Sequence, residues 1–408
     1  MNMIFVLNIG STSLKFYLFN MDKEEILAKG YLERIGNADS PMSYTIQDRE
    51  IVRARIDTTS GYGIGIKTII NIVIDAGILK NLSEINGIGF KAVHAGKLSE
   101  PSLITDEVMA IMEDFYCVVP AHNPPYVKAM KQFKELIPDI PMVAAFETDF
   151  HRRIPDYVYI YSIPYDWYEK YKIRKYGFHG ASHRYVSERA AKILQLPKEE
   201  LKMITCHLGG SSSISAIRNG ISIDNSMGFS TQAGMPMSTR SGDIDPFIIP
   251  YIMKKENLSL EEVMEKLIKD SGLKGISGAS GDVRDLEENY SISYRSKLAF
   301  DILCYSIKKY IGSYLAVLGG IDVLIFTGGI GENSSKLREK VCEGLEFLGL
   351  ELDLDQNKLA KSERLISKDS SRIKVVIIPT NEEIIVARET LKVLESRKIH
   401  LRGRKNER

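Results

Sequence analysis

Short apolar runs alternate with longer amphipathic stretches along this chain, and Gly, Ser, Pro or Asn residues separate them. The first two runs, at 3–9 and 14–20, are rich in β-branched and aromatic residues. They flank a turn of Gly, Ser, Thr and Ser, so the simplest interpretation is a β-hairpin. The other elements expected of the first half are a helix at 65–80, a strand at 87–94, helices near 105–116 and 125–136, and a buried strand at 141–148.

The second half begins with the same arrangement. Apolar runs at 202–209 and 214–223 surround a Ser-rich turn and predict a second hairpin. After it we expect helices at 246–255, 260–270 and 296–317, a strand at 321–327, a helix at 334–349, a strand at 374–380 and a helix at 382–396. Alternating strands and helices indicate an α/β protein with partly parallel sheets. The two halves look like two copies of one βββαβα unit.

Length and composition narrow the class of protein. A chain of 408 residues is too long for one ordinary core and predicts two domains. The net charge of +1 gives no indication of a surface for nucleic acid or membrane. The four cysteines stand far apart without Cys-x-x-Cys spacing, which argues against a disulfide framework and fits a reducing compartment. The N-terminus has neither a basic segment nor an apolar run long enough for a signal sequence, so we expect a cytoplasmic protein.

The two hairpin turns share one pattern, because residues 10–13 fall opposite residues 210–213, half the chain apart. Backbone N–H groups and hydroxyls at such a turn form a neutral cradle for a polyanion, and glycine lets the backbone approach a phosphate closely. Either turn alone is equally an ordinary polar hairpin. Their repetition favours two phosphate-binding turns, one in each domain, on either side of a shared cleft.

A second glycine-rich segment, GGIGEN, follows the strand expected at 321–327. It lacks the third glycine of the Rossmann fingerprint, and no Walker motif is present in the chain. We interpret this segment as a strand-to-helix turn on which a nucleoside lies.

The most specific stretches of the chain are LNIGSTSLKF, KYGFHGASHR, NSMGF, STRSGDIDP, FTGGIGENS and IPTNEE. Together they resemble the acetate kinase family, and the resemblance extends over nearly the whole chain. It implies two duplicated actin-like (ribonuclease H-like) α/β domains around a central cleft. Domain I would comprise residues 1–150 with a C-terminal helix at 384–408, and domain II, on the nucleotide-binding side, residues 151–383. Several substituted positions suggest a divergent member.

The resemblance implies an activity as well as a fold. The family phosphorylates a short carboxylate (acetate, or here propionate or butyrate) to an acyl phosphate, reversibly and by direct in-line transfer. ATP and ADP are the nucleotide substrates, and Mg²⁺ or Mn²⁺ is the cofactor. A carboxylate is already an anion, so catalysis requires positioning and charge neutralisation rather than a strong base. The resemblance also implies a homodimer.

By resemblance, Arg240 orients the carboxylate and faces the transferred phosphoryl group, because its planar fork suits both anions. The alternative is a structural ion pair with Asp243 or Asp245. His179 is implied as the histidine that stabilises the phosphoryl group, with a core or capping histidine as the alternative. His179 and His183 have i,i+4 spacing, but the His-Glu-x-x-His pattern of a zinc site is absent.

Asn8 and Glu383 look like the family's Mg²⁺-associated pair, which fits the oxygen ligands that Mg²⁺ prefers. The sequence does not choose between Glu383 and the adjacent Glu382. His122 is implied to approach the substrate, and Lys15 is equally an ordinary surface lysine. The positions implied to contact the nucleotide are Ser11, Ser13, Lys15, His207, Gly209, Gly210, Ser211, Asp282, Arg284, Gly329, Ile330, Gly331 and Asn333.

Several positions of the implied catalytic set depart from the family. Lys91 stands where Arg is usual, and a lysine lacks the bidentate fork of arginine. Ala95 replaces a Gly, and Glu147 replaces an Asp, which moves the carboxylate one methylene further out. Gly210 replaces an Asn, which removes one side-chain donor.

The implied carboxylate pocket also changes. Val93 and Phe178 match the family, whereas Ala121 replaces a Leu and Thr231 replaces a Pro. Losing the Leu side chain opens volume, and one methylene shifts substrate preference by about 1–3 kcal/mol. The sequence therefore suggests an acid longer than acetate.

Other interpretations stay open. One is a weakened paralogue that binds nucleotide but turns over slowly, and another is a nucleotide-driven conformational protein, because the same fold serves filaments and chaperones. A Rossmann-type dehydrogenase is a distant third, because the repeated hairpin argues against it. The acid-facing set of Arg240, His179 and His122 favours an active carboxylate kinase, since a filament or chaperone would not need it.

Overall fold

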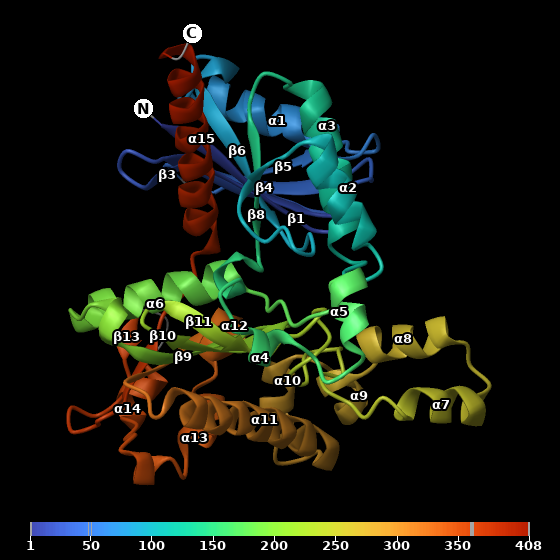
Figure 1. Cartoon of the computed structure of the whole chain (residues 1–408), viewed down its shortest axis with the longest axis vertical. Helices are drawn as coiled ribbons and strands as arrows, with labels where there is room; N and C mark the ends of the chain where they lie inside the picture. The colour runs from blue at the N-terminus through green and yellow to red at the C-terminus, as the bar shows by residue number, and fades with distance from the viewer. Residues whose placement is uncertain (1, 48, 50, 360–362, 407–408) are drawn as a thin grey trace. The chain divides into compact units, whose positions relative to one another are not determined.

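Two β-sheets, one in each half of the chain, organise this protein (Figure 1). The structure is a computed structural model that describes residues 2–47, 49, 51–359 and 363–406. The chain divides into two compact units, the first made of Met1–Asp149 and Glu382–Arg408 and the second of Phe150–Asn381. These limits lie within two residues of those expected from the sequence, and they assign both Glu382 and Glu383 to the first unit.

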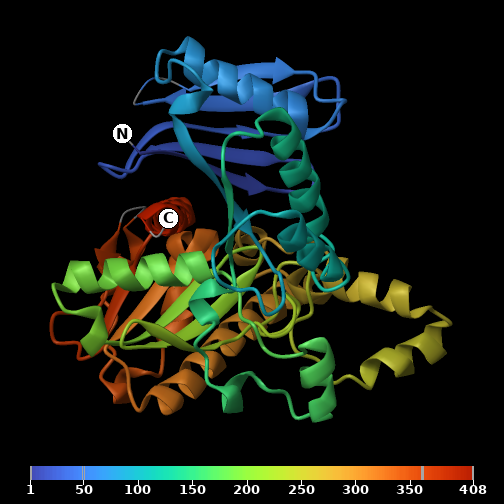
Figure 2. The ribbon, with the colours of Figure 1, turned by 45° about the horizontal axis from the view of Figure 1, so that its top comes forward.

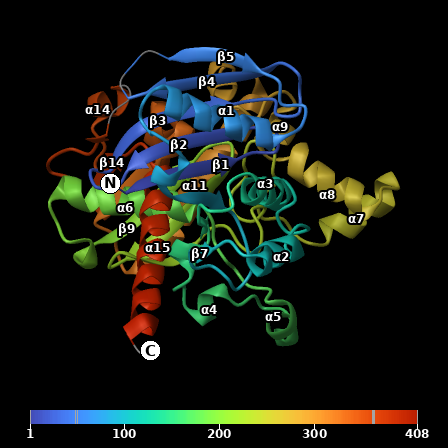
Figure 3. The ribbon, with the colours of Figure 1, turned by 90° about the horizontal axis from the view of Figure 1, so that it is seen from above.

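The first sheet has eight strands in the order β5-β4-β3-β2-β1-β6-β8-β7, and Figure 3 shows β5 to β1 side by side. β1 to β5 form an antiparallel meander, whereas β1, β6 and β8 are parallel. The strands are β1 (Met3–Ile9), β2 (Leu14–Asn20), β3 (Glu25–Leu32), β4 (Ser40–Ile46), β5 (Val52–Ile56), β6 (Ile85–Ala92), β7 (Ser102–Leu103) and β8 (Met142–Phe146).

Successive side chains of β6 point to opposite faces of this sheet, and a different helix covers each face. The helices of the unit are α1 (Tyr62–Asp75), α2 (Asp106–Asp114), α3 (Asn123–Leu136) and α15 (Glu382–Asn406). Phe90 packs edge to face on Phe133 of α3, with ring centroids 5.4 Å apart. Gly89 faces the other way, where an added Cβ would collide with Thr390 of α15. Glycine therefore lets the last helix of the chain lie directly against β6.

The second sheet has six strands in the order β11-β10-β9-β12-β14-β13. The strands are β9 (Lys202–Leu208), β10 (Ser212–Arg218), β11 (Ile221–Asn225), β12 (Val323–Thr327), β13 (Arg364–Leu365) and β14 (Lys374–Ile377). β9, β10 and β11 are antiparallel neighbours, whereas β9, β12 and β14 are parallel. The orders β3-β2-β1-β6-β8 and β11-β10-β9-β12-β14 therefore correspond in sequence order and in direction, which confirms the predicted duplication.

Helices cover both faces of the second sheet, as Figure 1 and Figure 2 show for α6 (Gly180–Leu194) and α11 (Tyr294–Leu318). Val186 of α6 belongs to a core with Met203 and Ile325, whereas Phe300 of α11 belongs to a second core with Ile204. Adjacent residues of β9 thus enter different cores. This explains why β9 and β12 carry apolar residues on both faces rather than on one face alone.

Several features differ from the sequence predictions. The meander strands β3, β4 and β5 and the helix α6 were not predicted. The segment after β12 is not a turn, because Gly328–Asn333 forms the short helix α12. The helix expected at 334–349 ends early: α13 spans Ser335–Cys342, and Gly344 follows with a φ of 78°. A left-handed glycine is a common way for a helix to end.

The remaining helices join the elements of the second unit. They are α4 (Asp156–Tyr159), α5 (Tyr165–Tyr171), α7 (Ile248–Glu256), α8 (Leu260–Lys269), α9 (Gly272–Ser277), α10 (Val283–Glu288) and α14 (Leu354–Lys358), and the 3-10 helices of the chain are η1 (Leu82–Glu84), η2 (Asp149–His151), η3 (Lys198–Glu200) and η4 (Glu346–Leu348). None of the helices within the described ranges combines the length and the apolarity that a bilayer crossing needs.

Candidate active site

The first turn of interest lies between β1 and β2. Gly10 N donates to Ser13 O at 2.8 Å, and Tyr62 Oη donates to Gly10 O at 2.5 Å. Ser11 is exposed and Ser13 is half-buried. The carbonyl of Gly10 is thus tied back to α1, and the serine hydroxyls lie at the end of the hairpin, as expected for a turn that receives an anion.

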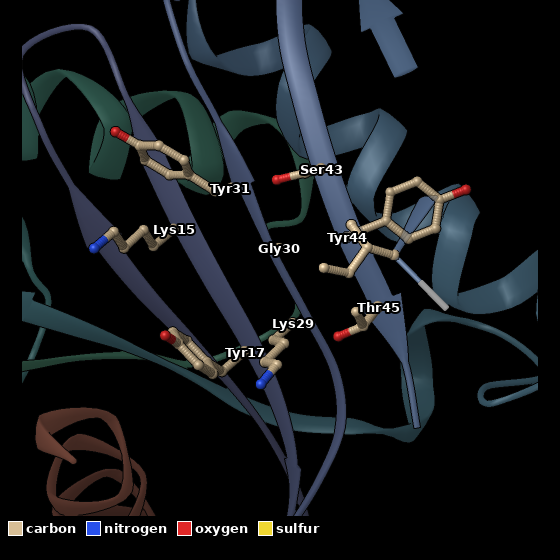
Figure 4. A pocket seen from close by; sticks show the side chains of 9 residues that line it. Lys15, Tyr17, Lys29, Gly30, Tyr31, Ser43, Tyr44 and Thr45 are labelled. Carbon is tan, nitrogen blue, oxygen red and sulfur yellow. The ribbon is translucent and has the colours of Figure 1, made fainter. Parts of the chain in front are cut away.

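Lys15 lies on β2, beyond this turn. It pairs with Asn8 of β1 and with Tyr31 of β3, and its ammonium lies 5.5 Å from the centre of the Tyr31 ring. Figure 4 shows it in a cavity of about 420 Å³, which Lys15 lines together with Tyr17, Lys29, Gly30, Tyr31, Ser43, Tyr44, Thr45 and Ile51. Lys15 therefore shares a sheet face with Asn8, and its side chain lies in an aromatic and polar environment.

A buried charge cluster lies beside this face. Lys91 of β6 places its Nζ 3.0 Å from Glu147 Oε1 and forms a second ion pair with Glu382, the first residue of α15. The three side chains are only 15%, 6% and 9% exposed. Burial lowers the pKa of Lys91, but the carboxylates of Glu147 and Glu382 outweigh it and hold that pKa well above the usual value. Lys91 is therefore a permanent cation at this site.

Glu147 and Glu383 are the two carboxylates of this region whose pKa values burial raises. Burial raises the pKa of Glu147, although the nearby Lys91 opposes the shift. Within the described residues neither carboxylate oxygen of Glu147 has a hydrogen bond of good geometry; the close Lys91 ammonium is an ion pair. Burial also raises the pKa of Glu383, Lys91 again opposes the shift, and Glu382 adds to it. These carboxylates lie in an environment that favours a further cation.

Tyr126 of α3 connects this cluster with Asn8. Its hydroxyl donates to Asn8 Oδ1 at 3.1 Å and accepts from Ile9 N at 3.0 Å. The Tyr126 side chain is buried, and burial raises its pKa above the usual range of a tyrosine. A neutral phenol therefore fixes the Asn8 amide at the end of β1.

The first unit also holds His122 and two residues of the expected acid pocket. His122 immediately precedes α3 and does not cap that helix with its side chain. Ala121 beside it is exposed, whereas Val93 is buried. Within the described residues, no group of three or more His, Cys, Asp or Glu side chains is arranged to hold a metal ion by itself.

In the second unit, His179 occupies a strained position at the start of α6. Its backbone is left-handed, with φ 57° and ψ 32°, a conformation that costs a non-glycine residue about 1–3 kcal/mol and is typical of functional sites. Its Nδ1 lies 2.8 Å from Ser213 Oγ, and its ring stacks on His207 with centroids 4.2 Å apart. His151 and His183 extend this cluster into the interior. Four of the chain's seven histidines thus lie together.

The second turn lies one residue earlier than expected, and the expected match between 10–13 and 210–213 is wrong. Leu208 of β9 pairs with Ser212 of β10, so the turn contains only residues 209–211, and Ser213 belongs to the strand. A Cβ added at Gly210 would meet its nearest neighbour, Ser238 Oγ, at 3.7 Å. That is an ordinary contact, so packing does not require glycine in place of the usual Asn.

Arg240 is hydrogen-bonded to this turn. Its Nη1 donates to Ser211 Oγ at 3.0 Å and to Thr231 O at 3.2 Å, and burial lowers its pKa. Across the described ranges Arg240 makes no ion pair with Asp243 or Asp245. Asp243 instead accepts hydrogen bonds from Gly234 N and Tyr310 Oη. The structure thus brings Arg240, Ser211 and the Thr231 carbonyl together and disfavours the ion pair that the sequence left open.

The expected nucleoside positions lie near the same edge of the second sheet. Gly328, which begins α12, has a φ of 77° and approaches the Leu208 carbonyl so closely that no side chain fits. Ser238 links the turn to the α10 segment, because its N donates to Gly210 O and its Oγ donates to Gly281 O. Ligands of α/β sheets bind beyond the carboxyl ends of the parallel strands, and this edge is such a place.

Individual nucleoside positions differ in what they contact. Gly329 has open space where a Cβ would lie, and Asn333 Nδ2 donates to Gly329 O at 2.8 Å. Ile330 is half-buried and Gly331 is buried within α12. Asp282 caps α10 by accepting from Arg284 N at 2.9 Å, and the Arg284 side chain, 84% exposed, pairs with it. Phe178 is 1% exposed, so its side chain lies in the core rather than on an open wall.

Sequence reasoning missed Tyr126, which holds Asn8 in the first unit. It considered Glu382, His183 and Ser213, but it did not predict that Glu382 pairs with Lys91 or that His183 and Ser213 support His179. The i,i+4 spacing of His179 and His183 was a signal that these two residues lie close together.

Known proteins resemble this chain closely. It matches the model of the Acetokinase family over residues 3–388. It is 48% identical to an acetate kinase of Thermoanaerobacterium thermosaccharolyticum, over 97% of this chain and 100% of that relative. The crystal structure of an acetate kinase from Porphyromonas gingivalis has a TM-score of 0.88 at 39% identity, over 97% of this chain and 100% of the other. A propionate kinase from Francisella tularensis has a TM-score of 0.88 at 35% identity, over 96% and 100%. Such identities mean that the chain is not clearly divergent, although its substitutions suggested that it was.

Proposed function

Because this chain belongs to the acetokinase family, we propose that it transfers the terminal phosphoryl group of ATP to a short-chain carboxylate and forms an acyl phosphate and ADP. Its two α/β units are the duplicated actin-like domains of that family. The transfer is direct, in line and reversible. The acid is its own nucleophile, so the protein supplies positioning and charge stabilisation.

The observation that carries this proposal is the setting of Arg240. Its guanidinium is half-buried and is held by neutral partners, Ser211 Oγ and Thr231 O, rather than by a carboxylate of the described residues. A partly buried cation with neutral partners is suited to bind anionic ligands. Arg240 orients the acid and stabilises charge on the transferred group, and His179 acts on the same group.

Lys91 takes the place of the usual arginine beside the acid. Its two ion pairs with Glu147 and Glu382 keep its ammonium fixed and charged, so the substitution retains a positive potential without the bidentate fork. His122 approaches the substrate from the start of α3. Val93, Ala121 and Thr231 form the wall of the acid pocket, and Phe178, which is buried in the core, supports that wall from behind.

The oxygen donors of the first unit fit a magnesium ion bound together with the nucleotide. Mg²⁺ usually keeps several waters and uses one or two carboxylates plus substrate phosphates, so a site without a full protein cage is expected. Asn8, which Tyr126 orients, and Glu383 would hold it, because Glu382 is already paired with Lys91. When bound, Mg²⁺ neutralises charge on the phosphate oxygens, and Mn²⁺ is a chemically similar substitute.

The nucleotide is bound largely by the second unit. The phosphates contact the turn at 209–211 with His207, and Ser11, Ser13 and Lys15 contribute from the first unit. Adenosine lies on α12, at Gly329, Ile330, Gly331 and Asn333, with Asp282 and Arg284 beside it. The open space at the Gly329 Cβ position supports a close approach of the ligand there.

We also infer acetate, propionate or butyrate as the acid, a homodimer as the assembly and the cytoplasm as the location, the latter two by analogy with the family. The similar proteins include both acetate kinases and a propionate kinase. A weakened paralogue is not favoured, since the charged groups are retained and the identity to acetate kinases is high. A filament-like or chaperone-like function is not favoured on the same grounds.

Trapping of acyl phosphate as a hydroxamate tests the proposal. The purified chain is incubated with ATP, Mg²⁺ and acids of two to five carbons, and we expect product with at least one of them. Arg240→Ala should lower kcat by at least about 100-fold, as expected for losing a donor to transition-state charge. Arg218→Ala is the matched control, because Arg218 is exposed on β10 and, among the residues that the structure describes, donates to Val317 O. An Arg240→Ala enzyme with unchanged kcat/KM would contradict the assigned role.

A further inference from the structure

A line of hydrogen-bonding groups leads from the interior of the second unit to His179. Thr205 Oγ1 lies 2.6 Å from His183 Nδ1, His183 Nε2 lies 2.7 Å from Ser213 Oγ, and Ser213 Oγ lies 2.8 Å from His179 Nδ1. Thr205, His183 and Ser213 are completely buried. The line comes from β9, α6 and β10, so the packing of three elements sets its geometry.

A second line leads to His207, the imidazole stacked on His179. Thr380 Oγ1 donates to Ser182 Oγ at 2.8 Å, and Ser182 Oγ lies 2.7 Å from His207 Nδ1. Because Ser182 accepts the Thr380 proton, its own proton is available for donation to His207 Nδ1. A neutral imidazole that accepts at Nδ1 carries its hydrogen on Nε2.

The number of protons in the first line limits the directions in which its hydrogen bonds can be donated. Burial lowers the pKa of His183 well below the usual value, so this ring is neutral and has a single N–H. It must then accept from one hydroxyl and donate to the other. When Ser213 donates to one of its two rings and accepts from the other, all hydrogen bonds of the line point the same way. If they point outward, Ser213 donates to His179 Nδ1 and His179 carries its hydrogen on Nε2. If they point inward, a neutral His179 has only an acceptor at Nε2.

We propose that these two lines are positioning groups that hold His179 and His207 as neutral Nε2–H tautomers, so that the stacked pair presents two N–H donors to the transferring phosphoryl group. The outward direction is the one that suits an anion, and it matches the direction of the second line. The inference rests on the proposed kinase function. It adds Thr205, His183 and Ser213, and Ser182 with Thr380, to the residues on which the reaction depends.

Neutral donors have a physical advantage here. Arg240 already supplies positive charge, and two cationic imidazoles 4.2 Å apart would repel each other. An N–H donor of fixed orientation needs no reorganisation when charge develops in the transition state. Fixing the tautomer through a partner at Nδ1 is the way in which many catalytic and metal-bound histidines are oriented.

The tautomer can be measured without any substitution. In the full-length protein labelled with ¹⁵N in the histidine rings and free of nucleotide, a long-range ¹H–¹⁵N correlation spectrum at pH 7.5 distinguishes N–H from acceptor nitrogens. Loss of signals in His179→Asn and His207→Asn assigns the two rings. We expect an acceptor-type Nδ1 and a protonated Nε2 in both. A protonated Nδ1 in His179, alone or together with Nε2, would overturn the inference.

Kinetics test whether the line matters for the reaction. Thr205→Val removes the hydroxyl at the far end, two groups away from His179, and should lower kcat about tenfold while both KM values stay within about twofold. Thr205→Ser keeps the hydroxyl and should stay within about twofold of the wild type. Ser213→Ala should lower kcat at least as much as Thr205→Val. Ser215→Ala is its control, because Ser215 is equally buried on β10 but bonds to Ser222 and Asp224 O.

The outcomes separate this inference from the proposed function. A Thr205→Val enzyme with unchanged His179 shifts and unchanged kcat would refute it, even if the wild type is an active kinase. If the wild type phosphorylates no acid, the proposed function fails, and the histidine spectrum alone then decides the tautomers. If Thr205→Val does not fold, the wild-type spectrum still shows whether the two histidines are Nε2–H tautomers.

Discussion

Replacing Lys91 by Met tests the charge cluster of the first unit most directly. The ammonium of Lys91 neutralises Glu147 and Glu382, whose side chains are only 6% and 9% exposed. A methionine of similar shape fills the space but removes the ammonium that pairs with both carboxylates. Breaking a buried ion pair from one side costs about 3–5 kcal/mol, mostly because the remaining charge stays buried. In a domain of about 150–250 residues, each kcal/mol lowers the melting temperature by about 2–4 °C. We therefore expect the melting temperature of the first unit to fall by roughly 6–20 °C at pH 8.

The loss of stability caused by Lys91→Met should be smaller at acidic pH. Burial already raises the pKa of Glu147 against the effect of Lys91, and removing Lys91 raises it further. A carboxyl group whose pKa is higher in the folded than in the unfolded state binds more protons when folded. The resulting loss of folding stability is absent below the pKa of the unfolded state, about 4.3 for Glu. It grows as the pH rises from that value to the pKa of the folded state. The difference in melting temperature between Lys91→Met and the wild type should therefore be smaller at pH 5.5 than at pH 8.

Melting curves followed by circular dichroism, in buffer with EDTA, measure both effects. Lys131→Met is the matched control, because Lys131 pairs with Glu113 at 2.7 Å on the surface, where both side chains are 40% exposed or more. A surface pair of this kind contributes about 0–1 kcal/mol. Lys91→Arg keeps the charge and should lose far less than Lys91→Met. The reasoning is refuted if Lys91→Met melts within about 2 °C of Lys131→Met at pH 8, or if its loss is larger at pH 5.5.

Three further predictions concern substrate, metal and pH. Ala121→Leu should shift the ratio of kcat/KM values toward acetate and away from propionate or butyrate by about tenfold, and an unchanged ratio would show that this position does not set pocket size. In a magnesium titration, Glu383→Ala should raise the Mg²⁺ concentration needed for half-maximal activity more than Glu382→Ala; the reverse order would exchange their roles. Burial lowers the pKa of His151 to about 4, below its unfolded value of about 6.5, so the second unit should lose stability as the pH falls from 6.5 to 4. His151→Asn should flatten this dependence in melting curves, and an equally steep curve would contradict the explanation.

The local sequence pattern was sufficient to predict the strands that are apolar on both faces. β1, β9 and β12 are covered by helices on each side, so they appear in the sequence as mainly apolar runs next to a turn. The meander strands β3 to β5 are half exposed and carry mixed residues, so they have no such signal. The α12 helix was missed because glycine disfavours helix locally, whereas packing of its first residues against β9 determines the conformation.

The sequence by itself indicated the duplicated α/β fold, the two hydroxyl-rich turns and the residue types of a phosphoryl-transfer site, since these depend on local periodicity and short motifs. Only the tertiary structure decided which carboxylate pairs with Lys91, because Glu382 lies 291 residues away along the chain. It also decided that Arg240 has neutral partners and that Thr380 reaches Ser182 across 198 residues. Such contacts are set by strand order and by the direction of each side chain. One residue of register moves a side chain to the opposite face of a sheet, and local sequence carries no record of the partner it then meets.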